Sequence, residues 1–216
     1  MKSFRIEIKN QTFELLPQKA AFWIEKKTLI VSDIHLGKAG HFRKSGIPAP
    51  TQINNTNLER LGQLMKQLMP ERVLILGDLF HSDVNREWLQ FEEWRQKYSK
   101  TPFYLITGNH DRLHNSFYQS ADLLIFDELT EEHFLFIHDA DEINQTKSHT
   151  VVAGHIHPAV KIRGMGRQSL RLPCFVVSEQ KFLFPAFGTF TGLHTIKPDE
   201  SEKVIAIAED QLIQIQ

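Results

Sequence analysis

The chain has 216 residues, with 25 Lys or Arg against 26 Asp or Glu, so its formal charge is -1 when histidine is neutral. This balance excludes a protein coated in positive charge for bulk nucleic-acid binding. The single cysteine, Cys174, excludes an internal disulfide and a cysteine-based zinc site, whereas 11 histidines are present. Any metal site is therefore expected to use nitrogen and oxygen ligands.

Length and composition predict one domain over residues 1–216, with an N-terminal hairpin at about residues 3–16 as an appendage. The first residues lack the unbroken apolar core of a signal peptide. No apolar run approaches the ~18 residues of a membrane helix. We therefore expect a cytoplasmic protein that does not associate with membranes.

Short apolar segments alternate with longer polar segments along the chain. Residues 4–8 and 12–16 alternate in polarity around a polar turn and predict the opening hairpin. Further strands are predicted at residues 28–32, 72–76, 102–106, 134–138, 150–154, 174–178, 181–184 and 204–208.

Two helices are predicted between these strands. Thr51 or Asn54 can cap the first, whose apolar residues recur at helical spacing until Pro70 ends it. The second covers about residues 85–98. Strands separated by helices indicate an α/β fold with a parallel core sheet, followed by antiparallel pairing near the C-terminus.

Residues that can bind a metal lie at the ends of five predicted strands, which we expect to be buried: 28–32, 72–76, 102–106, 134–138 and 150–154. The clusters are Asp33 and His35, Asp78 and His81, Asn109 to Asp111, His138 and Asp139, and His155 and His157. The carboxyl ends of parallel strands meet at one edge of an open α/β sheet, so these clusters are expected to converge. A single histidine after a strand is more often an ordinary polar residue; the prediction depends on five clusters in order.

The expected donors are carboxylates, imidazoles and an amide without thiolate, a mixture that favours Mn²⁺, Fe or Zn²⁺ over Ca²⁺ or a soft metal. Seven such ligands, one or two from each cluster, are too many for one tetrahedral ion and suit two divalent ions. With carboxylates from Asp33 and Asp78, the site would keep a charge of about +2, which suits a phosphate ester. Two ions roughly 3.5–4 Å apart can hold a deprotonated water and clamp both ends of an in-line displacement.

The motif series Asp-x-His, Gly-Asp-x-x-His, Gly-Asn-His-Asp, His and Gly-His-x-His over residues 33–157 resembles the calcineurin-like metallophosphoesterase superfamily. The resemblance implies a four-layer α/β/β/α sandwich with both metals at its sheet edges. It implies that Asp33, His35 and His157 hold one metal, that Asn109, His138 and His155 hold the other, and that Asp78 bridges them. It also implies that a metal-bridging hydroxide attacks the phosphorus, while His110 contacts the phosphate and protonates the leaving oxygen as general acid.

Segments outside the ligands, including residues 32–50, 154–159 and 184–192, resemble the ligase-associated phosphoesterase group (PdeM), which is related to the SbcD-type repair nucleases. This resemblance implies a DNA-repair setting, with a DNA ligase and a helicase as functional partners. Mn²⁺ is the favoured metal, with Fe or Zn²⁺ as alternatives.

His81 stands where the nuclease relatives keep a histidine near the scissile phosphate, and a loop histidine is the alternative. Asp139 departs from the pattern, because many relatives have glycine after the fourth-motif histidine.

Two basic stretches follow the first and last motifs. The candidate phosphate contacts in them are Lys38, Arg43, Arg163 and Arg167. The second stretch lies in a segment without Asp or Glu from residue 160 to 178, and Gly164 and Gly166 predict a mobile loop there. An ordinary solvated loop is the alternative for each stretch.

The leading hypothesis is a metal-dependent phosphodiesterase, and possibly a nuclease, that acts on nucleic acid or nucleotides in DNA repair. One alternative keeps the site but takes a small non-nucleic diester or a nucleotide-sugar as substrate. The other is a non-catalytic scaffold with the metallophosphoesterase fold, against which the filled ligand positions and His110 argue.

Overall fold

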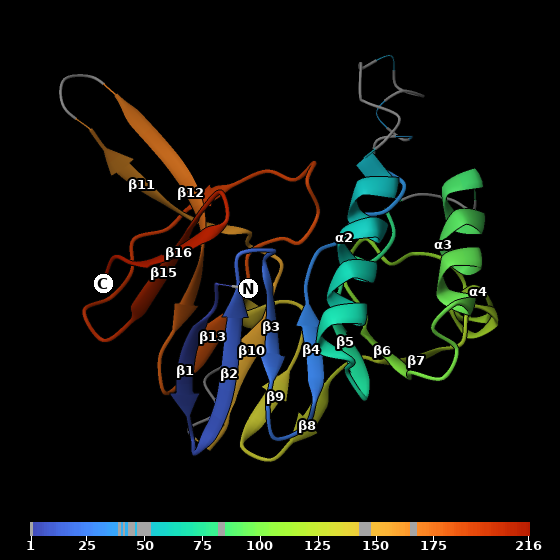
Figure 1. Cartoon of the computed structure of the whole chain (residues 1–216), viewed down its shortest axis with the longest axis horizontal. Helices are drawn as coiled ribbons and strands as arrows, with labels where there is room; N and C mark the ends of the chain where they lie inside the picture. Colours follow the sequence, from blue (N-terminus) through green and yellow to red (C-terminus); the bar gives the residue numbers. More distant parts are fainter. Residues whose placement is uncertain are drawn as a thin grey trace.

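The computed structural model describes residues 2–38, 40, 42, 46, 53–81, 85–142, 148–164 and 168–216. Two β-sheets pack face to face, and the α-helices of the described residues cover the outer face of the first sheet (Figure 1). None of these helices is long and apolar enough to cross a membrane. The α/β sandwich expected from the sequence is confirmed.

The first sheet has seven strands in the order β1 to β7, antiparallel from β1 to β4 and parallel from β4 to β7. They are β1 (Phe4–Ile8), β2 (Gln11–Leu16), β3 (Ala20–Trp23), β4 (Thr28–Val31), β5 (Arg72–Leu76), β6 (Phe103–Ile106) and β7 (Leu123–Phe126). The hairpin that the sequence predicts as an appendage is the edge of this sheet, because β2 pairs with β3 and Phe13 and Leu15 are buried between the sheets.

The second sheet has the strand order β14-β11-β12-β13-β10-β9-β8, and β15 and β16 extend it beside β12. Its strands are β8 (Leu129–Glu131), β9 (Phe134–Phe136), β10 (Thr150–Ala153), β11 (Pro158–Arg163), β12 (Ser169–Val177), β13 (Lys181–Leu183), β14 (His194–Thr195), β15 (Lys203–Ala208) and β16 (Gln211–Gln214). β9, β10 and β13 pair in parallel, as does β14 with β11, and the other pairs are antiparallel.

The helices are α2 (Ile53–Leu68), α3 (Arg86–Gln96), α4 (Asn115–Ser120) and the 3-10 helix η1 (Ala140–Glu142). Asn54 lies inside α2 and does not cap it, and Thr51 lies outside the described residues. Asn85 caps α3, because its side-chain oxygen accepts hydrogen bonds from two backbone N–H groups of the first turn. On the outer face of the second sheet, Ala140 of η1 packs against the apolar residues of that face.

Strand alternation builds a core on each side of the first sheet. In β4, Leu29 and Val31 face the helices, whereas Ile30 faces the second sheet. The core between the sheets is strongly aromatic. Phe13 stacks on Trp23 at a centroid distance of 5.4 Å and meets Phe134 and Phe182 edge-on.

Lys161 and Arg163 lie in β11 and Arg171 lies in β12, so these basic residues belong to a hairpin and not to the predicted loop; Gly166 lies outside the described residues. β11 and β12 pair antiparallel, with Ile162 opposite Leu170. Near the turn both strands alternate apolar and polar residues with period two, a pattern that predicts strands. Gly164 and Gly166 lie close to this pattern and favour a loop. In Figure 1 the hairpin projects from the body of the molecule.

Replacing Phe13 by alanine is expected to lower the free energy of unfolding by about 3–5 kcal/mol, because the substitution leaves a cavity among three packed aromatic rings. Urea denaturation measures the change. The matched control is Leu89→Ala on α3, where the side chain is 59% exposed and a change within about 0.5 kcal/mol is expected. Equal effects at the two positions would contradict this description of the core.

Candidate metal centre

Side chains that can bind a metal converge on one place from the strand ends of both sheets. Asp33 and His35 follow β4, Asp78 follows β5, Asn109 follows β6, His138 follows β9, and His155 and His157 follow β10. The convergence expected from the sequence therefore occurs, and it draws on the ends of strands in both sheets.

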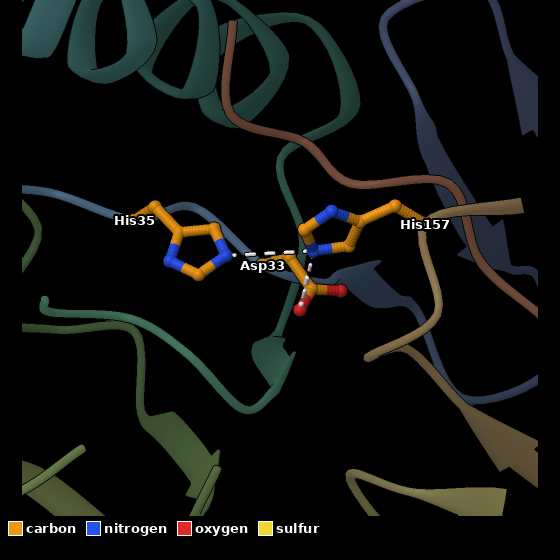
Figure 2. A group of neighbouring side chains, drawn as sticks. All are labelled: Asp33, His35 and His157. Carbon is orange, nitrogen blue, oxygen red and sulfur yellow. Dashed lines mark hydrogen bonds and ion pairs between the residues drawn. The ribbon is translucent and has the colours of Figure 1, made fainter. Parts of the chain in front are cut away.

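One group of donors consists of Asp33, His35 and His157, whose ligand atoms all lie within 4.8 Å of one another (Figure 2). Asp33 Oδ1 lies 3.2 Å from His157 Nε2, and the Nε2 atoms of the two histidines are 3.4 Å apart. Asp33 is fully buried and His35 is 4% exposed. The group therefore forms a compact donor set largely removed from water.

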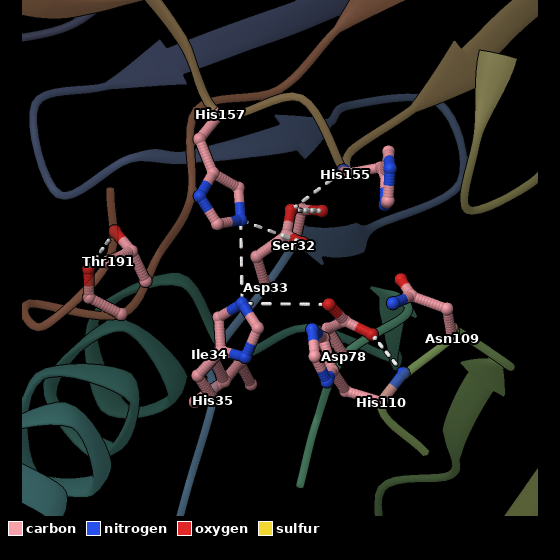
Figure 3. Close-up of polar contacts among 12 residues, drawn as sticks. Ser32, Asp33, Ile34, His35, Asp78, Asn109, His110, His155, His157 and Thr191 are labelled. Carbon is pink, nitrogen blue, oxygen red and sulfur yellow. Dashed lines mark hydrogen bonds and ion pairs between the residues drawn. The ribbon is translucent and has the colours of Figure 1, made fainter. Parts of the chain in front are cut away.

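A second group surrounds His138. Its Nε2 lies 3.2 Å from Asn109 Oδ1 and 3.1 Å from His155 Nδ1. Asp78 stands between the two groups (Figure 3). One carboxylate oxygen lies 3.6 Å from His35 Nε2, a contact marked in Figure 3. The other oxygen lies 3.5 Å from His138 Nε2.

The ring orientations leave lone pairs facing the centre. The Nδ1–H of His138 donates to the carbonyl of Leu76 at 2.9 Å, and that of His157 donates to the carbonyl of Gly192 at 3.2 Å. Each Nε2 is then an acceptor turned toward the carboxylates, the usual arrangement in a metal-ligating histidine.

This donor set fits divalent cations. With Nδ1–H turned to Gly192, a neutral His157 ring presents its Nε2 lone pair 3.2 Å from Asp33 Oδ1, and a metal ion between the two atoms would bind both. Within the described part of the chain, the ion-pair partners of Asp33 and Asp78 are histidines only. Carboxylate, imidazole and amide donors suit first-row metals such as Mn²⁺, Fe or Zn²⁺.

The backbone at the donors is in the left-handed region, which residues other than glycine rarely adopt. The residues concerned, with φ between 50° and 65°, are Asp33, His35, Asp78, His155 and His157. Glycine lets the neighbouring loops approach them: a Cβ on Gly77 would lie 2.1 Å from His138 Nδ1, and one on Gly154 would lie 1.7 Å from Ser32 Oγ. Such strain is typical of functional sites, where the surrounding packing enforces it.

Supporting residues hold the donor loops in place. Asp111 accepts hydrogen bonds from the backbone N–H groups of Phe80 and Gly108, each at 3.0 Å, and burial raises the pKa of its carboxyl to about 7. The sequence places Asp111 among the residues that can bind a metal, whereas in the structure its carboxylate supports the backbone of the donor loops.

Asn57 of α2 ties two further loops together, and the sequence carries no signal for it. Its amide donates to the carbonyl of Ile34 at 3.2 Å and accepts from the N–H of Thr189 at 3.2 Å. Asn57 is 1% exposed, so both contacts are shielded from water.

His110 and His81 lie beside the donors. The backbone N–H of His110 donates to Asp78 Oδ1 at 2.9 Å, and its ring centroid is 4.0 Å from that of His81. Each of the two rings is 5.4 Å from the ring of His35. Burial lowers the pKa of His110, and burial together with the charge of Lys38 lowers the pKa of His35. The two histidines proposed from the sequence as catalytic therefore share one wall of the centre.

The carboxylate of Asp139 also reaches the centre, with one oxygen 3.5 Å from His155 Nε2. The departure from the superfamily pattern noted in the sequence thus places an additional negative charge beside a donor histidine.

The four basic residues that the sequence predicts as phosphate contacts differ in their distance from the centre or lie outside the described residues. Lys38 is half-buried near the centre, where burial lowers its pKa and the charges of Asp78 and Asp33 oppose that shift. Arg163 ends the six-residue strand β11, about 16 Å past Pro158 at roughly 3.3 Å per residue. It therefore does not lie beside the donors. Arg43 and Arg167 lie outside the described residues.

Comparisons with known proteins agree with this geometry. Residues 26–185 match the calcineurin-like phosphoesterase family. The fold is similar to that of Pseudomonas putida nuclease MPE, with a TM-score of 0.84 and 33% identity over 98% of this chain and 100% of that one. Yfce, a phosphoesterase from E. coli, matches with 16% identity and a TM-score of 0.47 over 87% of this chain and 97% of its own.

A curated relative from Danio rerio, a transmembrane protein with metallophosphoesterase domain, is 32% identical over 97 residues. This match covers 45% of the present chain and 18% of the fish protein. The superfamily predicted from the motif series is confirmed by the family match, which spans most of the chain. The chain belongs to the calcineurin-like phosphoesterase family.

Proposed function

We propose that the chain is a two-metal phosphodiesterase that hydrolyses phosphodiester bonds of nucleic acid or nucleotides. The position of Asp78 carries the proposal. Its two carboxylate oxygens lie 3.6 Å from His35 Nε2 and 3.5 Å from His138 Nε2, and these nitrogens belong to different donor groups. A carboxylate with one oxygen toward each group is suited to bridge two ions.

The seven donors divide around that bridge. Asp33, His35 and His157 would hold one ion, Asn109, His138 and His155 the other, and Asp78 both. Divalent ions held there, with Mn²⁺ favoured, would supply a nucleophile from water at neutral pH and would polarise the phosphate. The carboxylates and neutral imidazoles of the chain orient the ions and leave a net positive site for an anionic substrate.

In this proposal His110 supplies the proton that the leaving oxygen needs. Its backbone N–H is fixed by Asp78, and its ring packs against His81 at the rim of the donor set. An imidazolium there can contact a phosphate oxygen and donate its Nε2 or Nδ1 proton to the departing alkoxide. His81 keeps the ring of His110 in position and adds a second polar contact for the phosphate.

Similarity to a nuclease over nearly the whole chain supports nucleic acid over a small non-nucleic diester as the substrate. A DNA-repair setting, with a DNA ligase and a helicase as functional partners, is part of this proposal.

Replacing Asp78 by asparagine is expected to lower turnover of bis-p-nitrophenyl phosphate with Mn²⁺ at least about 100-fold, because the bridge loses its charge and one of its two anionic oxygens. Metal analysis should also find less Mn²⁺ bound per chain. Asp210→Asn, at the exposed turn between β15 and β16, makes the same chemical change away from the centre and should be inert. Wild-type turnover in Asp78→Asn would exclude the two-metal mechanism.

Replacing His110 by alanine should affect two substrates unequally. Cleavage of a DNA strand should fall about 10²–10⁴-fold, because its alkoxide leaving group needs a proton. Turnover of bis-p-nitrophenyl phosphate should fall much less, because nitrophenolate is a stable anion. Steady-state kinetics on both substrates measure the difference, and an equal loss on both would show that His110 is not the general acid.

A further inference from the structure

The β11–β12 hairpin begins beside the metal centre and extends beyond the two sheets. β11 begins at Pro158, directly after the donor His157. β14 pairs with β11 only at Pro158 and Ala159, and β15 pairs with β12 only from Cys174 onward. Among the described residues, the outer part of each hairpin strand therefore pairs only with the other, and Figure 1 shows this part projecting from the body.

The register of the hairpin separates charged from apolar side chains. Lys161 lies opposite Arg171, and Arg163 lies two residues further along the same face. Ile162 lies opposite Leu170 on the other face, and these side chains are 38% and 60% exposed. We call Lys161, Arg163 and Arg171 the cationic face; all three are exposed.

The cationic face lies on the side of the second sheet that faces the first sheet. β12 runs without interruption from the hairpin into the body, where Phe175 packs between the sheets and Cys174 packs on the outer face. Alternation puts Arg171 on the same side as Phe175. The first sheet on that side carries Asp33 and Asp78 at its strand ends, so the cationic face and the metal centre open to the same side.

The charges of the cationic face are available to a ligand. In the described part of the chain, none of the ion pairs involves Lys161, Arg163 or Arg171. No Asp or Glu occurs from residue 160 to 178, although the whole chain has a formal charge of -1. Positive charge is therefore concentrated on a hairpin whose first strand begins directly after the donor His157.

We propose that the cationic face binds backbone phosphates of a nucleic-acid strand whose scissile bond lies at the metal centre. This inference rests on the proposed function and narrows its substrate to a strand of several nucleotides. Lys161 lies about 13 Å beyond His157 along the extended chain, at roughly 3.3 Å per residue, so a mononucleotide at the centre does not reach it. Contacts of lysine and arginine with phosphates position a strand without reading its sequence.

The test compares two triple variants that remove equal charge. Lys161→Gln/Arg163→Gln/Arg171→Gln removes the cationic face. The control, Lys66→Gln/Lys97→Gln/Lys100→Gln, neutralises exposed residues that precede β5 and β6 and so lie at the sheet edge opposite the metal centre. Each protein, supplied with Mn²⁺, is assayed on a single-stranded oligonucleotide of about 20 nucleotides and on bis-p-nitrophenyl phosphate.

Loss of the cationic face should lower the ratio of kcat/KM for the strand to that for bis-p-nitrophenyl phosphate about tenfold or more. The slope of log affinity for the strand against log salt concentration should fall by about 2, because three contacts contribute ~0.7 each. The control variant should keep the wild-type ratio and slope.

Three results would overturn the inference. The first is a wild-type ratio and slope in the cationic-face variant, and the second is an equal loss in both triple variants. The third is a change in the molecular mass of the cationic-face variant, measured by light scattering, while its salt slope stays at the wild-type value. That result would assign the hairpin to contact with a second copy of the chain. Hydrolysis of bis-p-nitrophenyl phosphate without any cleavage of the strand by the unsubstituted protein would reject the nucleic-acid substrate itself, whereas the Asp78→Asn result tests the two-metal centre separately.

Discussion

The burial of two carboxylates is the constraint on which the rest of the centre depends. Asp33 is fully buried and Asp78 is 2% exposed, and together with His138 they offer ligand atoms that all lie within 4.8 Å of one another. An unpaired buried carboxylate costs several kcal/mol, so these side chains need compensation. The N–H groups of His155 and His110 and the hydroxyl of Ser32 supply hydrogen bonds, and cations would supply the missing charge.

The backbone around the centre is also unusual. Left-handed conformations at the donor residues turn their side chains inward, and Gly77 and Gly154 leave room for the neighbouring loops. Strain of this kind persists only where surrounding packing enforces it. The three apolar cores of the two sheets provide that packing, and metal binding would add its own free energy to folding.

Much of this arrangement could be predicted from the sequence, because buried parallel strands such as β4 and β5 are apolar runs that end directly at donor residues. The rule that parallel strand ends share an edge then predicts that the donors lie together.

Contacts between distant segments could not be predicted in this way. Asn57 links Ile34 to Thr189, and no local pattern identifies either partner. β3 was missed because its four residues are all apolar or aromatic without alternation, and the β11–β12 hairpin was missed because its two glycines suggested a loop.

Near neutrality of the whole chain and action on a polyanion are compatible in this structure. The positive potential would be local: ions between the donors, Lys38 at the rim, and the cationic face of the hairpin. Steering and positioning of an anionic strand depend on such local fields and not on the net charge. In the proposed function, the chemistry and the binding of a strand would use different parts of the fold.

The central claim is that Asp78 joins two metal ions. Anomalous diffraction from crystals grown with Mn²⁺ tests it most directly. The account predicts two anomalous peaks per chain, roughly 3.5–4 Å apart, with one Asp78 oxygen beside each. A single peak at saturating Mn²⁺, or two peaks that Asp78 does not contact, would contradict it.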